Sequence, residues 1–109
     1  MSFIRIMIHA VWGTKNHAPY LTENIREKVL MHIKNNASVK QIYIDTINCH
    51  NDHVHCLVGL NADMTIAKVL QLLKGESSFW INREKLIPTK FEGADEYYAA
   101  SVCESLIER

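Results

Sequence analysis

The sequence predicts a single α+β domain with the element order β-α-β-β-α-β. Three observations support this. Apolar residues alternate along some segments, recur every three to four residues along two others, and are separated by turn-forming residues. The chain has 109 residues, close to the commonest length of one domain, and 48% of them are hydrophobic. This composition is enough for a core, and the four Gly and two Pro argue against disorder.

The first strand is expected over residues 3–12, which are rich in β-branched and aromatic types. Isoleucines at positions 4, 6 and 8 share one face of this strand, and Arg5 and His9 lie on the other. His9 and Trp12 also fall on opposite faces. This alternation indicates a strand with one buried side.

The first helix is expected over residues 23–35, after a polar loop that contains proline. Thr22 is placed to cap its first turn. Ile25, Val29 and Ile33 then recur at four-residue spacing, which gives the helix one apolar face. Two consecutive asparagines at its end are expected to stop it.

Two strands joined by a short turn are expected next, at residues 41–49 and 54–60. Asn and Asp occupy the centre of the link between them, residues 50–53, and this pair is typical of turns. Because so short a link can join only antiparallel neighbours, the sequence predicts a β-hairpin here.

The second helix is expected to begin after Asp63 or Thr65, either of which can cap it. Gly75 lies inside this helix and is expected to permit close approach of another backbone. Beyond Pro88, which ends the helical region, a fourth strand is expected at residues 97–103. The apolar face of the helix is marked by Ile66, Val69, Leu70, Leu73, Ser77, Trp80 and Ile81.

This element order is that of the ferredoxin-like, split-βαβ arrangement. It consists of a four-stranded antiparallel sheet with both helices on one face. The opposite face of the sheet is then free for function.

Charge and cysteine content restrict the function classes. The formal net charge is 0 at pH 7, so the molecule as a whole has no electrostatic reason to attract nucleic acid or membranes. No apolar run is long enough to span a membrane and the start of the chain lacks a signal-peptide pattern, so a cytoplasmic protein is expected. The three cysteines, Cys49, Cys56 and Cys103, are odd in number and lie in apolar segments, which favours reduced thiols.

Three of the six histidines lie close together, at His50, His53 and His55. Residues two apart in a strand project to the same face, so His53 and His55 are expected to form a two-imidazole ligand for a divalent cation. Two alternatives remain open at this point. The pair could decorate a solvated sheet face, or Cys49, His50 and Cys56 could form a closed zinc site.

The segment DHVHCLVGL (Asp52–Leu60) resembles the HUH motif of the single-tyrosine HUH transposases of bacterial insertion sequences, a group that includes the repeat-associated tyrosine transposases. The resemblance spans almost the whole chain. Three further segments resemble that family in the same order: HAVWGTKNHAPYL (His9–Leu21), LLKGESSFWIN (Leu72–Asn82) and YYAASVCES (Tyr97–Ser105).

This resemblance implies a ferredoxin-like homodimer that recognises hairpin or single-stranded DNA ends and cuts and rejoins single strands. It also implies that His53 and His55 hold Mg²⁺ or Mn²⁺ while a tyrosine hydroxyl forms a 5′-phosphotyrosine link. The covalent link conserves the energy of the phosphodiester bond, so no nucleotide cofactor is expected. Because Mg²⁺ prefers oxygen ligands, the metal is expected to bind weakly without DNA.

The chain also departs from the family pattern. In the family, the nucleophilic tyrosine and a glutamine that supplies a third metal ligand lie on a helix after the last strand, which corresponds to positions beyond Arg109. Tyr97 and Tyr98 match strand positions, and packing is the expected role of their rings. Gly93 stands where the family often has Trp. A truncated or degenerate transposase domain, unable to cleave DNA alone, is therefore expected.

Cationic side chains could contact phosphate, although for each of them a solvated role is the simpler expectation. The candidates are Lys15, Lys74, Arg83 and Lys85, with Lys68 and Lys90 as further possibilities. Phe79 and Trp80 are expected to be core or dimer contacts rather than platforms for bases. The alternative functions are a non-catalytic nucleic-acid-binding remnant of a transposase, a reader of single-stranded RNA, and a remnant that only folds.

Overall fold

The computed structural model describes residues 6–60 and 64–102, and these form four strands, two α-helices and one 3₁₀ turn. The expected order β-α-β-β-α-β is confirmed. The elements are β1 (Ile6–Thr14), η1 (Lys15–His17), α1 (Glu23–Val39), β2 (Tyr43–Cys49), β3 (His53–Leu60), α2 (Ile66–Arg83) and β4 (Gly93–Val102).

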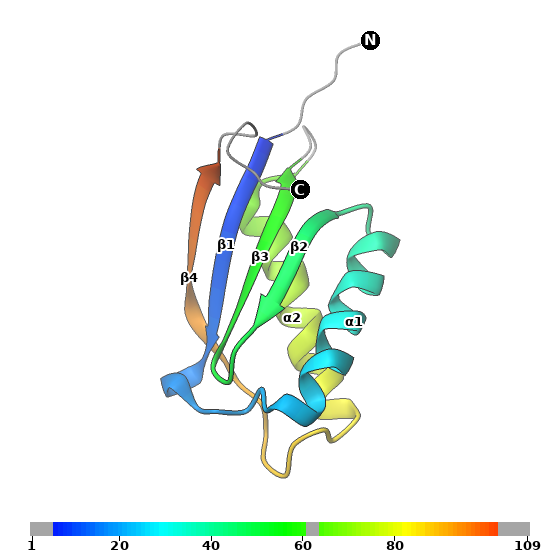
Figure 1. Cartoon of the computed structure of the whole chain (residues 1–109), viewed down its shortest axis with the longest axis vertical. Helices are drawn as coiled ribbons and strands as arrows, with labels where there is room; N and C mark the ends of the chain where they lie inside the picture. The colour runs from blue at the N-terminus through cyan, green and yellow to red at the C-terminus, as the bar shows by residue number, and fades with distance from the viewer. Residues whose placement is uncertain (1–5, 61–63, 103–109) are drawn as a thin grey trace.

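The strands form one antiparallel sheet in the order β2-β3-β1-β4, with β1 and β3 at its centre (Figure 1). Each central strand therefore has a neighbour on both sides, and β2 and β4 are the edges. This is the strand order of the split-βαβ arrangement that the sequence predicts. No helix in the described residues is both long and apolar enough to cross a membrane.

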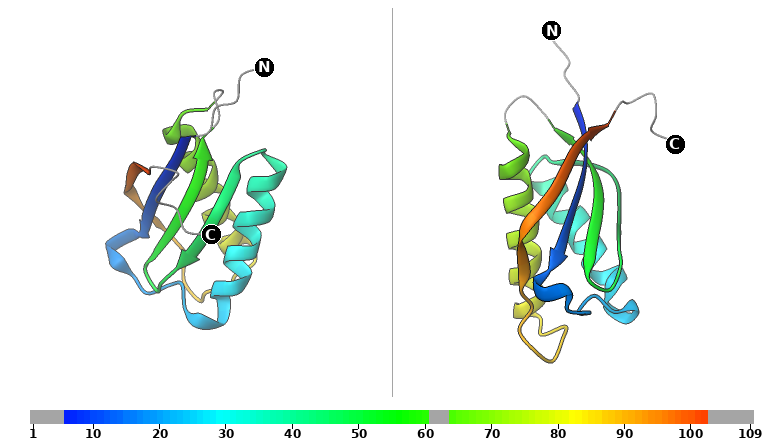
Figure 2. Two further views of the ribbon diagram at one scale, coloured as in Figure 1. Left: turned by 45° about the horizontal axis from the view of Figure 1, so that its top comes forward. Right: turned by 90° about the vertical axis from the view of Figure 1, so that its left-hand side faces the viewer.

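Both helices pack on one face of the sheet, and the core lies between the two layers (Figures 1 and 2). Alternate residues of the central strands point into this core, as the side-chain period of a strand requires. The buried strand residues on this face include Ala10, Trp12, Cys49, Val54, Cys56 and Val58, and they meet the buried faces of α1 and α2. The other face of the sheet is the open face.

Helix α1 extends four residues beyond its expected end, because Asn35 and Asn36 do not stop it. Ala37, which follows the asparagines, is buried in the core and favours another helical turn. The helix ends at Val39 and is terminated by Gln41, two residues later, which has φ of 60°. Gln41 N–H donates to Ser38 O at 3.1 Å and Ile42 N–H to Ala37 O at 2.8 Å, the bonding pattern of a Schellman motif.

Strand β2 contains an irregularity that the alternation rule did not predict. It begins at Tyr43 rather than residue 41, and its pairing with β3 shifts register between Ile44 and Thr46. The extra residue lets Ile44 and Ile47, three apart in sequence, both pack against the core.

Helix α2 begins after Thr65, whose side-chain oxygen accepts from Lys68 N–H at 3.1 Å. The other cap candidate, Asp63, lies outside the described residues. The expected role of Gly75 is wrong, because a Cβ placed there would meet nothing within 4 Å. Trp80 is half-buried against the core. Phe79 is exposed, and the Arg83 guanidinium carbon lies 5.8 Å from the centroid of the Phe79 ring.

Strand β4 begins at Gly93, four residues before its expected start, because Gly93 pairs with Thr14 at the end of β1 beyond a shift in register. Its expected last residue, Cys103, lies outside the described part of the chain. The described cysteines, Cys49 and Cys56, are free thiols with 2% of their surface exposed, and they fill space on the helix side of the sheet as expected.

Replacing Gln41 with glycine should stabilise the protein. A non-glycine residue with positive φ costs about 1–2 kcal/mol, and the extra freedom of glycine in the unfolded chain returns part of this, so the net gain should be about 0.5–1 kcal/mol. Urea unfolding of Gln41→Gly measures it. The matched control, Lys34→Gly inside the exposed face of α1, should lose about 1 kcal/mol. A destabilised Gln41→Gly protein would contradict this account of the helix end.

The two buried thiols should resist modification in the folded protein. Burial raises the pKa of the Cys49 thiol and raises that of Cys56 to about 12, so neither forms the reactive thiolate near neutral pH. In a Cys103→Ser variant, a disulfide reagent such as DTNB should react slowly with the native protein and label both thiols in denaturant. Fast labelling before unfolding would show that one of the two is accessible.

Candidate metal centre

The three clustered histidines lie at the tip of the β2–β3 hairpin. Strand β2 ends at Cys49 and β3 begins at His53, so the predicted hairpin is confirmed. His50 N–H donates to His53 O at 2.8 Å and closes a turn with Asn51 and Asp52 at its centre. The pair that the sequence identified as turn-forming therefore sets the loop length and the register of the hairpin.

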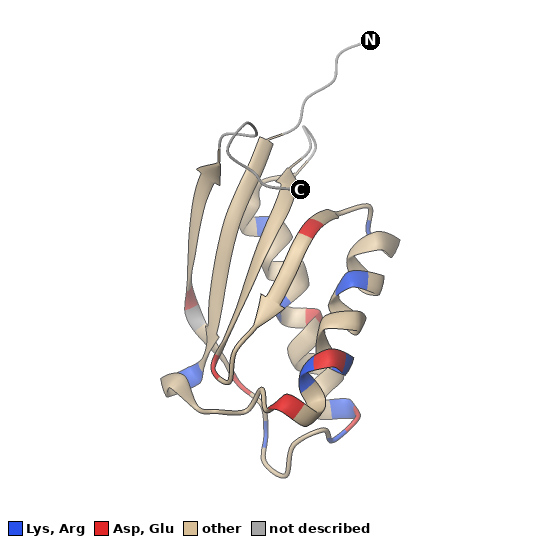
Figure 3. Cartoon of the chain, in the orientation of Figure 1, with Lys and Arg blue, Asp and Glu red and all other residues tan. Residues whose placement is uncertain are grey.

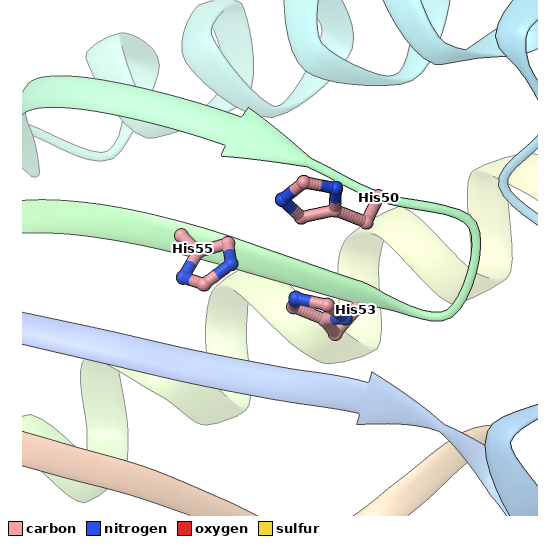
Figure 4. Close-up of side chains that lie close together, drawn as sticks. All are labelled: His50, His53 and His55. Atoms are coloured by element: carbon pink, nitrogen blue, oxygen red, sulfur yellow. The ribbon is translucent and has the colours of Figure 1, made fainter.

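His53 and His55 share the open face of the sheet, as the alternation of β3 predicts. The residues between and after them, Val54, Cys56 and Val58, are almost fully buried on the helix side. The two imidazole rings are partly exposed and their centroids lie 4.6 Å apart (Figure 4). They are neither splayed to opposite sides nor covered by the core.

His50 joins this pair. The ligand nitrogens of His50, His53 and His55 lie within 4.8 Å of one another, and this is the one such group of metal-ligand side chains found among residues 6–60 and 64–102. Sequence reasoning placed His50 only in a closed zinc site with Cys49 and Cys56. Those two sulfurs are buried on the helix side and do not belong to the group. The sequence did contain a signal for including His50 in the group: it lies opposite His53 across a two-residue turn.

Asp52 orients the His53 ring. The Nδ1 atom of His53 lies 2.6 Å from Asp52 Oδ1 and can donate to it, which directs Nε2 toward the other two histidines. This hydrogen bond is the largest cause of the lowered pKa of Asp52; desolvation opposes it, and the charges of His53 and His17 lower the pKa further. The carboxylate is therefore ionised at neutral pH and able to accept.

The turn itself is held by the segments around it. Thr14 N–H donates to Asp52 O and Leu21 N–H to Asn51 O, both at 2.8 Å, and Arg26 Nη2 donates to Asn51 Oδ1 at 2.6 Å. These bonds come from the end of β1, from the loop just before α1 and from the first turn of α1. The histidines thus stand on a braced loop whose backbone needs little ordering when a ligand binds.

Gly13 makes this bracing possible. It pairs with His53 across the sheet, and a Cβ on it would lie 3.3 Å from Asp52 O. Any larger residue would therefore press against the carbonyl that Thr14 contacts. The glycine lets the end of β1 approach the turn closely.

His9 and Tyr98 extend the group across the open face. The His9 ring lies parallel to that of His55, with centroids 5.9 Å apart, and Tyr98 meets His9 edge-on at 6.4 Å. Partial burial lowers the pKa of His55, and the neighbouring imidazoles of His53, His50 and His9 lower it further. Both causes favour the neutral ring, which is the form that binds metal. From the sequence, His9 was placed only on the strand face opposite Trp12, without a link to the other histidines.

The donor set fits a divalent cation. Imidazole nitrogens from three residues approach one another, one ring is oriented by a carboxylate, and one has a lowered pKa that keeps it neutral. Water or a ligand oxygen can approach from the open side of the sheet. Such a cation could act as a Lewis acid on an oxyanion bound next to it.

The cationic candidates are spread around the molecule rather than gathered at this centre (Figure 3). Lys15 directly follows β1 and lies 3.5 Å from Glu92. Lys74, Arg83 and Lys85 belong to α2 or its end, on the helix side of the sheet. Lys74 Nζ donates to Ala94 O at 2.9 Å, and Arg83 pairs with Glu84 at 3.2 Å. None of the four described strands contains Lys or Arg.

The sequence matches the family described as IS200-like transposases over residues 2–108, nearly the whole chain. The chain belongs to the IS200-like transposase family. The resemblance seen in the sequence is thereby confirmed, and two residues of the candidate centre, His53 and His55, lie in the segment that resembles the HUH motif of these transposases. No curated protein matches the chain.

Two solved structures share the fold of this family member. A transposase candidate from Deinococcus radiodurans R1 is 19% identical with a TM-score of 0.81, over 94% of this chain and 83% of that one. A REP-associated tyrosine transposase bound to a REP hairpin is 14% identical with a TM-score of 0.67. That match covers 95% of this chain and 61% of the larger protein.

Removing the carboxylate that orients His53 should weaken metal binding. In Asp52→Asn the ring loses its ionised acceptor, and such changes next to a ligand typically cost about 10–100-fold in affinity. Titration of the metal-free protein with Co²⁺, followed by absorption or calorimetry, measures the loss. The control is His17→Ala, which removes the more distant partner of Asp52, at 3.7 Å, and should leave affinity within about twofold. Equal affinities for wild type and Asp52→Asn would mean that the carboxylate does not position the ligand.

Proposed function

We propose that this transposase-family protein binds hairpin or single-stranded DNA ends on the open face of its sheet, next to a divalent cation held by His53 and His55. The observation that supports this most directly is the clustering of these two rings on the accessible face of a sheet that belongs to the transposase fold. The hairpin bound to the REP-associated relative supports the choice of DNA. The site of action would be the cytoplasm.

The charge distribution also supports a cation at this position. The strands carry no Lys or Arg in the described residues, so the open face has few permanent positive charges of its own. Arg26 of α1 lines a pocket with His50 and His53 but donates to Leu21 O and Asn51 Oδ1, so a metal ion would add counter-charge for a phosphate that approaches the histidines. A divalent cation there, Mg²⁺ or Mn²⁺ in the family, would neutralise the phosphate and polarise its P–O bonds.

The described residues of the protein would hold and orient the DNA rather than cleave it. Tyr97 pairs with Trp12 and shares its helix-side face, so its hydroxyl is directed away from the histidines. Tyr98 lies on the open face, but it packs edge-on against His9 from a strand. The family places its nucleophile on a later helix. We therefore assign the nucleophile to neither Tyr97 nor Tyr98, and propose that the described residues bind DNA without cleaving it.

Phosphate contacts are proposed for Lys15, Lys74, Arg83 and Lys85. Lys15 follows the end of β1 that braces the turn, so it is placed to meet a strand that enters the centre. The other three lie on the helix side, where they would contact a different part of the DNA. Each such contact would make the affinity fall with salt.

A homodimer is part of the proposal. The exposed edges of the sheet, β2 and β4, are surfaces that a second copy could cover. Size-exclusion chromatography with light scattering over a range of concentrations measures the mass directly. A monomer at all concentrations, with and without DNA, would remove the dimer from the proposal.

DNA binding should depend on the metal and on the two motif histidines. A gel-shift titration at low salt should give tighter binding to a hairpin DNA than to an unstructured RNA, and tighter binding with Mn²⁺ than with EDTA. The double variant His53→Ala/His55→Ala should lose the metal dependence, whereas His17→Ala should keep it. Because no nucleophile is assigned, the hairpin should stay uncut in a denaturing gel.

Each other outcome has a definite meaning. Full metal affinity in the double variant would refute the site assignment. Preference for RNA would favour an RNA-binding module, and absence of any nucleic-acid binding would leave a domain that only folds. Cleavage that disappears in Tyr98→Phe would overturn the assignment of Tyr98 to packing.

A further inference from the structure

His50 stands opposite His53 across the turn. Cys49 pairs with Val54, so the next pair outward along the hairpin is His50 with His53, which the 2.8 Å bond from His50 N–H to His53 O joins. Facing residues of an antiparallel pair direct their side chains to the same side of the sheet. His55 follows His53 by two residues and lies on that side as well. The hairpin therefore presents three imidazoles at the corners of a triangle (Figure 4).

The dimensions of this triangle are close to those of a metal site. The ring centroid of His50 lies 4.8 Å from that of His53 and 5.4 Å from that of His55. The ligand nitrogens of the three residues all lie within 4.8 Å of one another. Three nitrogens at about 2.0–2.1 Å from one ion are separated by roughly 3.0–3.4 Å. The three side chains would have to rotate to close this difference, on a turn whose backbone Thr14, Leu21 and Arg26 already brace.

We infer that His50 is the third protein ligand of the cation, so that one hairpin supplies a complete three-imidazole site. The inference rests on the proposed function for the cation at His53 and His55 and adds the residue that completes it. The resemblance to the transposase family puts a third ligand on a later helix. Here the turn provides one within the described residues.

This ligand set changes the expected metal. Three neutral nitrogens with no oxygen from the protein favour Zn²⁺, Co²⁺ and Ni²⁺, whereas Mg²⁺ demands oxygen ligands and loses its water reluctantly. The open face leaves further coordination positions to water or to a phosphate oxygen. The hairpin is thus expected to bind a nitrogen-preferring divalent ion without DNA, in contrast to the weak site expected from two histidines and Mg²⁺.

The test is a titration of untagged, metal-free protein with Co²⁺, Zn²⁺ and Mg²⁺ near neutral pH. A Cys103→Ser background removes the thiol outside the described residues as a competing ligand. Co²⁺ absorption reports the ligand field directly, and calorimetry gives the stoichiometry. Wild type should bind one Co²⁺ or Zn²⁺, and a large excess of Mg²⁺ should not displace it.

His50→Ala should lower Co²⁺ affinity at least about tenfold and change the absorption band, because one nitrogen is replaced by water. His17→Ala is the matched control, since it removes another exposed histidine near the same turn. Thermal unfolding without metal should be alike in wild type and His50→Ala because the side chain is exposed. With Zn²⁺ added, the rise in unfolding midpoint should be larger for wild type, as binding to the folded state requires.

The outcomes separate this inference from the proposed function. If His50→Ala binds Co²⁺ as wild type does while His53→Ala/His55→Ala does not, the third ligand is refuted and the cation at the motif pair stands. If no histidine variant changes Co²⁺ binding, both fail. Displacement of Co²⁺ by Mg²⁺ at comparable concentration would refute the metal preference.

Discussion

The alternation of side chains along β3 is the constraint on which the rest of this structure depends. Val54, Cys56 and Val58 seal one face of that strand against the helices, which leaves the other face to His53 and His55. A shift of one residue in its pairing with β1 would turn the histidines into the core and expose the apolar residues. The burial that stabilises the sheet therefore also fixes the orientation of the candidate metal ligands. Fold and site rest on one pattern.

The second requirement is a rigid turn, and it comes from neighbours distant in sequence. The end of β1 contacts the carbonyl of Asp52, while Leu21, just before α1, donates to Asn51 O and Arg26 of α1 donates to Asn51 Oδ1. Gly13 allows the first of these approaches. A two-residue turn at the edge of a sheet would otherwise be free to move, and a three-imidazole site would lose affinity in proportion to the ordering it needs. Bracing of this kind is consistent with a binding site on the hairpin.

The distribution of charge gives the two faces of the molecule different means of binding a nucleic acid. The open face carries imidazoles and tyrosine but no Lys or Arg in the described strands, whereas the helix side carries Lys74 and Arg83. A nucleic acid held by both faces would meet fixed positive charge on one and metal-dependent charge on the other. Binding would then respond separately to salt and to chelators, which gives the two contributions distinct signatures.

The sequence by itself determined the order of elements, the hairpin and the face that His53 and His55 share, because each follows from a local period or from turn chemistry. Helix ends were less predictable: burial of Ala37 carries α1 past two asparagines, and a register shift lets Ile44 and Ile47 share a face. The open space at Gly75 depends on what packs nearby, and no local pattern encodes it. The predicted hairpin already implied that His50 faces His53, whereas only the tertiary structure brought His9 to the motif pair, since that depends on the pairing of β1 with β3. Periodicity along one strand sets which way a side chain points, whereas distances between strands are set by the packing of the whole sheet.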